Sequence, residues 1–122
     1  MKAFFFDTYA LHEIVMGNPA YLAAIDGAHI ITTKLNIMEL HYVILAKLGK
    51  EDAELAYDSF LPACVDIDDA LVKAANEFRL SWKRRDVSYV DCIGYLLAQR
   101  MGVEFLTGDR EFKDAPNVRF VK

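Results

Sequence analysis

The feature that most constrains the fold is the apolar run Ala3-Phe4-Phe5-Phe6, which ends at Asp7. Four consecutive apolar residues do not alternate between a buried and a solvent-facing side. Such a run is typical of a strand that is buried on both faces, as in a parallel sheet covered by helices. Ligands of open α/β sheets bind outside the carboxyl ends of the strands, so Asp7 stands where chemistry is expected. Capping of the following helix is an equally good interpretation of this residue alone.

Length and composition favour one globular domain over residues 1–122. The chain is 54% hydrophobic and carries a formal net charge of −4, which argues against general adhesion to nucleic acid. No apolar run approaches the roughly 18 residues of a membrane span, and the amino terminus does not resemble a signal peptide. We therefore expect a cytoplasmic protein without a membrane partner. Cys64 and Cys92 are far apart in the sequence and are expected to be core thiols.

Predicted strands alternate with predicted helices along the chain. After the first strand, β-branched or apolar runs predict strands at 29–33, 103–107 and 118–121, with a short β-like segment at 63–67. Helical patterns are found at 9–16, 20–25, 35–48, 51–61, 68–85 and 88–101. This alternation predicts the α/β class, as a three-layer α/β/α sandwich with a mainly parallel central sheet.

Two helical patterns contain residues that need an explanation. In helix 35–48 the spacing predicts an inward stripe of Leu35, Met38, Tyr42 and Leu45, with the acid Glu39 inside this apolar region. A buried Glu is costly unless it is paired or holds a cation, although a Glu at the stripe's edge reaches water through its flexible stem.

Helix 88–101 is apolar on nearly every side, which is typical of a central buried helix. Ser88 and Asp91 at its start resemble a capping box. Gly94 in its interior predicts the close approach of another backbone.

Four acids are predicted to meet at one edge of the sheet. Asp7 and Asp109 each follow a strand, while Glu39 and Asp91 lie near the starts of helices. Helices that follow parallel strands begin at the carboxyl edge of those strands. Four carboxylates brought together repel one another, and a hard divalent cation such as Mg²⁺ or Mn²⁺ relieves that repulsion. Clusters of this kind support two-metal hydrolysis of phosphodiesters.

At this point the chain resembles a known family, the PIN-domain nucleases, and among them the VapC-type toxins of toxin–antitoxin pairs. The resemblance covers essentially the whole chain. It rests on Phe6-Asp7-Thr8, Asn36-Ile37-Met38-Glu39-Leu40, Ser88-Tyr89-Val90-Asp91-Cys92 and Phe105-Leu106-Thr107-Gly108-Asp109-Arg110-Glu111-Phe112.

The resemblance implies an endoribonuclease that depends on Mg²⁺ or Mn²⁺ and hydrolyses RNA. It further implies a homodimer and a small antitoxin that covers the site. The implied metal-binding and catalytic acids are Asp7, Glu39, Asp91 and Asp109, and the implied supporting residues are Thr8, Ser88 and Thr107. Whether Asp114 adds a fifth acid stays open.

Other interpretations remain beside this one. The chain could be a PIN-domain RNA-processing nuclease outside a toxin pair, or a non-catalytic module that binds RNA or protein. Phosphatases of the haloacid dehalogenase type need a second acid two residues after the first, where this chain has Tyr9. Response-regulator receivers need an early acid pair, which is absent from the sequence. Fold alone does not choose among such functions.

A net acidic nuclease needs local cations to hold RNA phosphates. The candidate substrate-binding residues are Lys83, Arg84, Arg85 and Arg110, together with Lys34. Cations at 83–85 also suit the carboxyl end of a helix, which is the alternative explanation. Apolar residues of the first helices, Ile14, Val15 and Tyr21, form either a partner surface or part of the core.

Overall fold

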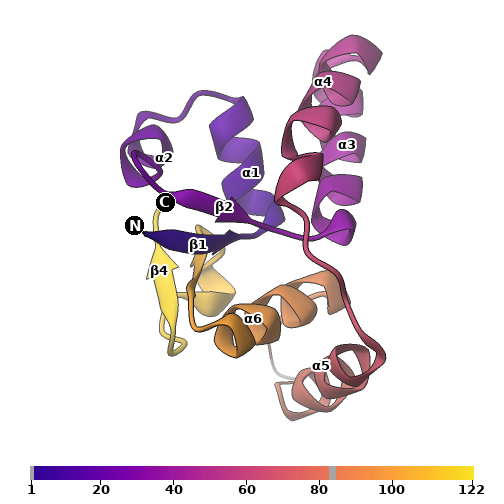
Figure 1. Ribbon diagram of the computed structural model, residues 1–122, viewed down its shortest axis with the longest axis vertical. Helices are drawn as coiled ribbons and strands as arrows, with labels where there is room; N and C mark the ends of the chain where they lie inside the picture. Colours follow the sequence, from indigo (N-terminus) through magenta and orange to yellow (C-terminus); the bar gives the residue numbers. More distant parts are fainter. Residues whose placement is uncertain (1, 83–84) are drawn as a thin grey trace.

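A computed structural model describes residues 2–82 and 85–122. Its centre is a four-stranded sheet in the order β2-β1-β3-β4, in which every neighbouring pair is parallel (Figure 1). The strands are β1 (Ala3–Phe6), β2 (His29–Ile31), β3 (Glu104–Thr107) and β4 (Val118–Phe120). The predicted α/β class with a parallel sheet is confirmed.

Helices cover both faces of this sheet, so the fold has three layers (Figure 1). One face carries α1 (Thr8–Val15), α2 (Pro19–Ala24), α3 (Lys34–Leu48) and α4 (Lys50–Phe60). The other carries α5 (Asp69–Ser81) and α6 (Tyr89–Met101). Two short 3-10 turns, η1 (Leu61–Ala63) and η2 (Arg110–Phe112), follow α4 and β3. Within the described residues, no helix has the length and apolar character needed to cross a membrane.

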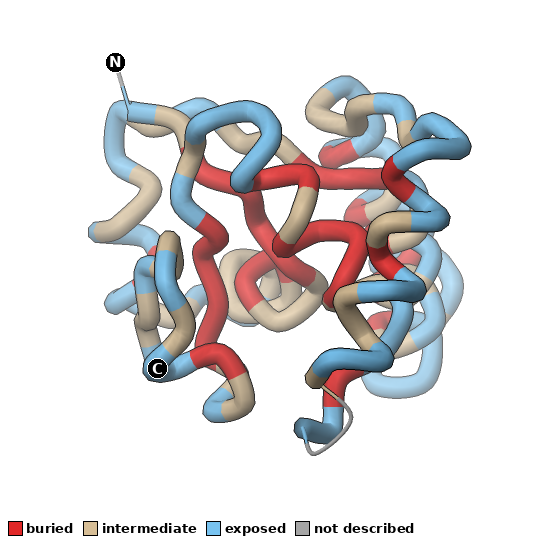
Figure 2. Tube along the Cα trace, turned by 90° about the horizontal axis from the view of Figure 1, so that it is seen from below, coloured by how far each residue is buried: buried red, intermediate tan, exposed pale blue. Residues whose placement is uncertain are grey.

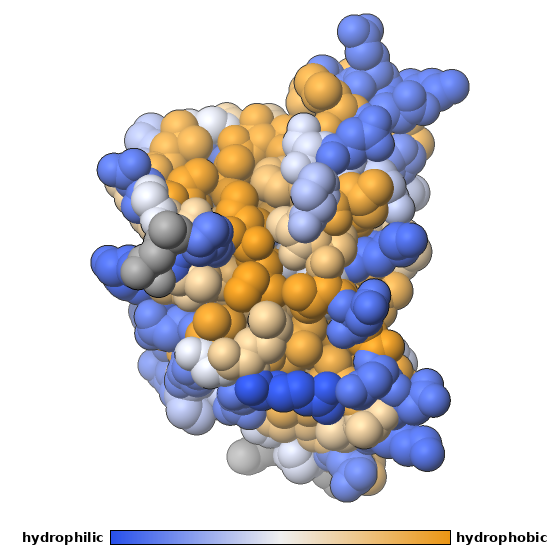
Figure 3. All heavy atoms as spheres, viewed as in Figure 1, coloured by the Kyte–Doolittle hydropathy of each residue, from blue (hydrophilic) through white to orange (hydrophobic). Residues whose placement is uncertain are grey.

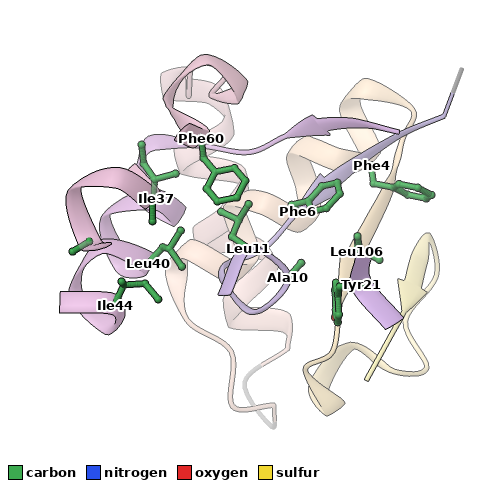
Figure 4. Close-up of a cluster of buried hydrophobic side chains, with 12 residues drawn as sticks. Phe4, Phe6, Ala10, Leu11, Tyr21, Ile37, Leu40, Ile44, Phe60 and Leu106 are labelled. Carbon is green, nitrogen blue, oxygen red and sulfur yellow. The ribbon is translucent and has the colours of Figure 1, made fainter. Parts of the chain in front are cut away.

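The three phenylalanines of β1 divide between the two faces of the sheet. Phe4 and Phe6 pack into the cluster beneath α1 to α4 (Figure 4), whereas Phe5 belongs to the cluster beneath α5 and α6. The Phe5 ring stacks on that of Phe105 with 5.8 Å between their centroids. Because both faces bury aromatic rings, the strand is apolar without interruption, and the buried chain runs through the middle of the molecule (Figure 2).

The predicted inward stripe of α3 is wrong. Ile37, Leu40 and Ile44 are fully buried, whereas Met38 is 54% exposed and Tyr42 is 73% exposed. Leu45 is exposed as well, and Leu35 is half-buried. The helix carries apolar residues around most of its circumference, so spacing alone could not choose the side that meets the sheet.

Two smaller predictions also need correction, and one open alternative is decided. Residues 63–67 form no strand, and only an isolated bridge joins Thr32 to Cys64. The helix that begins after Asp68 ends at Ser81, earlier than 85. Tyr21 is fully buried, so of its two open alternatives, a partner surface or the core, the structure supports the core.

Gly94 does meet a close neighbour, but that neighbour is a ring rather than a backbone. A Cβ at this position would lie 2.6 Å from Cε1 of Phe5 and 3.2 Å from Cε1 of Phe105. The missing side chain lets α6 lie directly on the aromatic residues of β1 and β3. This contact sets the depth at which α6, and Asp91 near its start, approach the sheet.

Candidate active site at the carboxyl edge of the sheet

Two of the four predicted acids leave neighbouring strands at the same edge. Phe6 lies opposite Leu106 in the parallel pairing of β1 with β3, so both strands end side by side. Asp7 follows β1 directly, and Asp109 follows β3 after one intervening residue, Gly108. The hydroxyl of Thr107 joins the two acids, since it donates to Oδ2 of Asp7 and accepts from the backbone N–H of Asp109 at 3.0 Å.

Asp7 is the most enclosed of the acids, with only 2% of its surface exposed. Its Oδ1 accepts from the backbone N–H of Ala10 at 2.8 Å, so the residue also caps α1. The pKa of this carboxyl is raised to about 8. Burial is the largest cause, the hydrogen bonds from Thr107 and Ala10 oppose it, and the charges of Asp91 and Asp109 add to it. A carboxylate in this position therefore carries an unusually large penalty for its negative charge.

Glu39 comes to the site from α3. Its Oε1 accepts from the hydroxyl of Thr8 at 2.6 Å, and that hydroxyl in turn accepts from the amide of Asn36 at 3.2 Å. The amide oxygen of Asn36 accepts from the hydroxyl of Thr33, the N-cap of α3, at 2.6 Å. Burial raises the pKa of Glu39, the Thr8 bond lowers it, and the charge of Asp91 raises it. The half-buried Glu39 is thus held by a chain of side chains, not left at the edge of a stripe.

Asp91 reaches the same edge from α6. The predicted capping box is confirmed: Ser88 N–H donates to Oδ2 of Asp91 at 2.9 Å, and Asp91 N–H donates to the Ser88 hydroxyl at 3.1 Å. Burial raises the pKa of Asp91, against the hydrogen bonds from Ser88, and Asp109 and Asp86 raise it further. The reason for its position differs from our expectation, because α6 follows α5 rather than a strand. Because the end of α6 leads into the start of β3, the start of α6 lies beside the carboxyl end of that strand.

The negative charges of the site link all four carboxyl groups. Asp91 and Asp109 raise the pKa of Asp7, and Asp91 raises the pKa of Glu39. In residues 2–82 and 85–122, no Lys or Arg forms an ion pair with any of the four. The site therefore brings together negative charge that the described cations do not neutralise directly.

A hard divalent cation fits this donor set in its chemistry. The oxygens Oε2 of Glu39, Oδ1 of Asp91 and Oδ2 of Asp109 accept no hydrogen bond from the described part of the chain. Carboxylate oxygens are the ligands that Mg²⁺ and Mn²⁺ prefer. Across the same residues, however, no group of three or more His, Cys, Asp or Glu side chains is placed so that it could hold a metal ion.

The predicted substrate-binding cations are spread around this edge. Arg110 directly follows Asp109 and is exposed, and Lys34 is exposed at the start of α3. The guanidinium of Arg85 lies over the Trp82 ring at 4.4 Å and donates to the carbonyl of Glu111 at 2.5 Å.

The remaining predicted residues are Lys83, Arg84 and Asp114. Lys83 and Arg84 lie outside the described residues. Asp114 is exposed, and among the described residues no hydrogen bond joins it to the four acids.

Sequence reasoning missed two parts of the site. Asn36 is fully enclosed three residues before Glu39, and a polar residue on the buried side of an apolar helix is the signal that could have revealed it. Gly108 leaves room for Tyr9, because a Cβ there would lie 2.2 Å from the Tyr9 ring and 2.6 Å from the carbonyl oxygen of Val121. The glycine between strand and acid is the corresponding signal.

Fold and site together define an α/β protein with an acid cluster at the carboxyl edge of a parallel sheet. The family model of the PIN domain matches residues 4–118. The chain therefore belongs to the PIN-domain family, which confirms the resemblance inferred from its motifs. A sequence comparison with curated proteins gives no match.

Solved structures of toxins share this fold. VapC20 of Mycobacterium tuberculosis, a toxin that cleaves the sarcin–ricin loop, is 17% identical, with a TM-score of 0.80 over 94% of this chain and 96% of that chain. A toxin–antitoxin complex from Klebsiella pneumoniae is 18% identical, with a TM-score of 0.75 over 95% of each chain. VapBC of Salmonella typhimurium bound to DNA is 21% identical, with a TM-score of 0.74 over 99% of this chain and 98% of that chain. At these identities the similarity establishes a common fold.

Proposed function

We propose that this protein is a metal-dependent endoribonuclease, and that it acts in the cytoplasm as the toxin of a toxin–antitoxin pair. The observation that carries the proposal is the burial of Asp7 beside other acids, without an ion pair to any described cation. Membership of the PIN-domain family and the shared fold with VapC20, itself a toxin that cleaves RNA, support it. We further propose that residues 1–122 form one domain.

The residues proposed to hold Mg²⁺ or Mn²⁺ are Asp7, Glu39, Asp91 and Asp109. When bound there, the metal supplies a Lewis acid for the phosphate oxygens and lowers the pKa of a water that attacks phosphorus. The protein's own part is to hold the carboxylates in place: Thr107 anchors Asp7 and the backbone of Asp109, Thr8 anchors Glu39, and Ser88 anchors Asp91. Exposed Arg85 and Arg110, with Lys83 and Arg84, are proposed to bind the RNA backbone.

An antitoxin and a second copy of the chain are the proposed protein partners. An apolar groove of about 600 Å³ runs beside Glu39 and is lined by Thr8, Met38, Tyr42 and Val43. In the upper right of Figure 3, over α3 and α4, hydrophobic residues stand among hydrophilic ones. A partner that covers exposed Met38 and Tyr42 would remove apolar surface from water and shield Glu39 at the same time. The antitoxins in the Klebsiella and Salmonella complexes motivate this assignment.

The first experiment compares RNA cleavage by wild type, Asp7→Asn and Asp26→Asn with Mn²⁺ and with EDTA. Asp26 is an exposed acid in the turn after α2, so its variant controls for the loss of one charge. We expect Asp7→Asn to lower the cleavage rate by more than about 100-fold, since removing a metal ligand exceeds the usual 10–100-fold effect of its supporting residues. EDTA should abolish cleavage, and Asp26→Asn should retain it. Cleavage that survives in Asp7→Asn would contradict the proposal.

The alternatives differ in measurable ways. A PIN-domain RNA-processing nuclease would cleave RNA in the same assay but would have no antitoxin that inhibits it. A non-catalytic binding module would cleave no RNA, and removal of divalent metal would leave its melting temperature unchanged.

A further inference from the structure

A cleft beside the proposed site contains none of the four acids and has no role in the proposed metal binding. It measures about 420 Å³ and lies between α5 and the start of α6, lined by Asn76, Arg79, Leu80, Arg85 and Tyr89. This volume falls within the range of small-ligand pockets. Two arginines and no acid line it among the described residues, so its charge is opposite to that of the neighbouring carboxylate edge.

Both arginines are held in place by the protein. Arg79 donates from Nε to the carbonyl of Val87 at 3.1 Å, and its guanidinium carbon lies 4.3 Å from the centre of the Tyr89 ring. Arg85 lies over Trp82 and donates to Glu111, as described above. Trp82 in turn packs on Phe78 with 4.5 Å between the ring centroids. Arginines positioned in this way lose less side-chain entropy when they bind a phosphate.

Tyr89 adds an aromatic surface to these charges. One face of its ring is covered by Arg79, yet 56% of the residue remains exposed. An exposed aromatic ring that shares a cleft with two cations matches the requirements of a nucleotide, whose base stacks on aromatic rings and whose phosphate is negatively charged. A bare phosphate or acidic peptide would use the arginines but not the ring.

The cleft is also next to the acids in the chain and in space. Tyr89 follows Ser88 and precedes Asp91 by two residues, on the first turn of α6. The segment that carries Arg85 is tied to η2, because Asp86 N–H donates to Oε1 of Glu111 at 2.7 Å. Since η2 begins immediately after Asp109, this link places the Arg85 side of the cleft next to the carboxylate edge.

We propose that this cleft binds one nucleotide of single-stranded RNA next to the phosphodiester that is cut. Its base stacks on Tyr89, and its phosphate lies against Arg79 and Arg85. The proposal rests on the proposed ribonuclease function and extends it by assigning Arg79 and Tyr89 to substrate binding. A single strand is required because bases within a duplex are already stacked on their neighbours.

The test measures binding of a fluorescently labelled single-stranded RNA by anisotropy in EDTA, where the proposed cleavage does not occur. We expect Tyr89→Ala to weaken binding about tenfold with an unchanged salt slope. Arg79→Gln should weaken binding and lower the salt slope by about one. Tyr89→Phe keeps the ring and should keep the affinity. Arg119→Gln is the charge control, because Arg119 pairs with Glu104 at the opposite end of β3.

Three results would overturn the proposal. The first is wild-type affinity in Tyr89→Ala, an exposed position where the variant is expected to fold. The second is an equal loss on an RNA hairpin duplex, which presents no unstacked base. The third is a wild type that neither binds nor cleaves RNA, which also removes the ribonuclease function. If wild type binds RNA and cleaves it with Mn²⁺ while Tyr89→Ala does both equally well, only the assignment of the cleft fails.

Discussion

The carboxylate edge has two parts that are held in different ways. The strand part, Asp7 and Asp109, is joined through the single hydroxyl of Thr107 at the ends of β1 and β3. In the helix part, the Glu39 carboxylate accepts from the Thr8 hydroxyl, and the Asp91 carboxylate accepts from the backbone N–H of Ser88. The strand part includes the fully enclosed Asp7, whereas Glu39 and Asp91 are half-buried.

Helix capping accounts for the local positions of three of the acids but not for the burial of Asp7. Asp7 caps α1, Asp91 completes a capping box, and Asp109 accepts from the Glu111 N–H at the start of η2. Capping thus explains each of these acids singly. It does not explain why Asp7 is buried beside other acids, because a cap functions equally well in solvent. The enclosure of Asp7 is therefore the feature that favours a bound cation.

The largest expected effect is the pH dependence of the stability of the metal-free protein. The unfolded chain loses the Asp7 proton near the ordinary pKa of 3.8, whereas the folded protein keeps it to about 8. Between these values the folded state binds more protons, so the free energy of unfolding should fall as pH rises, on the order of a few kcal/mol. Urea unfolding in EDTA at pH 5 and pH 8 measures this fall.

Asp7→Asn should remove most of that pH dependence and stabilise the metal-free protein at pH 8. Glu39→Gln should change it less, because Glu39 is only half-buried. If both variants follow the wild-type pH curve, the contrast between the strand part and the helix part is wrong.

The next effect concerns the two glycines that position the acids. Gly108→Ala would push its Cβ against the Tyr9 ring and a backbone carbonyl, and Gly94→Ala would push against the Phe5 ring. Overpacking of this kind costs about 1–3 kcal/mol, and we expect Gly108→Ala to be the more costly because a backbone carbonyl cannot rotate away.

The two glycine variants should differ more clearly in metal response. Gly108 adjoins Asp109, whereas Gly94 lies three residues from Asp91, so Gly108→Ala should lose more of the Mn²⁺-induced rise in melting temperature. Equal metal responses in both variants would show that the strand part tolerates displacement as well as the helix part does.

The smallest expected effect is the loss of folding free energy when a supporting hydroxyl is removed. Thr107→Val leaves Oδ2 of Asp7 and the Asp109 N–H without their buried partner, at a cost of about 1–3 kcal/mol. Thr8→Val removes a part-buried bond to Glu39, at a cost of about 1 kcal/mol. Denaturant unfolding of both variants ranks the two costs, and the reverse order would contradict the comparison.

Much of the fold followed from local patterns in the sequence. The uninterrupted apolar run at Phe4–Phe6 predicted a strand buried on both faces, and aromatic rings are packed on both faces. Ser88 with Asp91 predicted a capping box, which is present. These patterns are readable because a strand period or a helix cap depends on residues only a few positions apart. The roles of the four acids stay predictions, although the structure gathers them at one edge.

Tertiary contacts decided what the patterns left open. Apolar residues surround most of α3, so only packing against the sheet determined that Ile37 is buried and Tyr42 exposed. The link from Thr107 to Asp7 spans 100 positions, and the contact between Arg79 and Tyr89 joins two helices. By itself the sequence determined the strand ends and helix starts that carry the acids. The partners that hold those acids, and the cleft beside them, depend on which distant segments meet, and no local period encodes that.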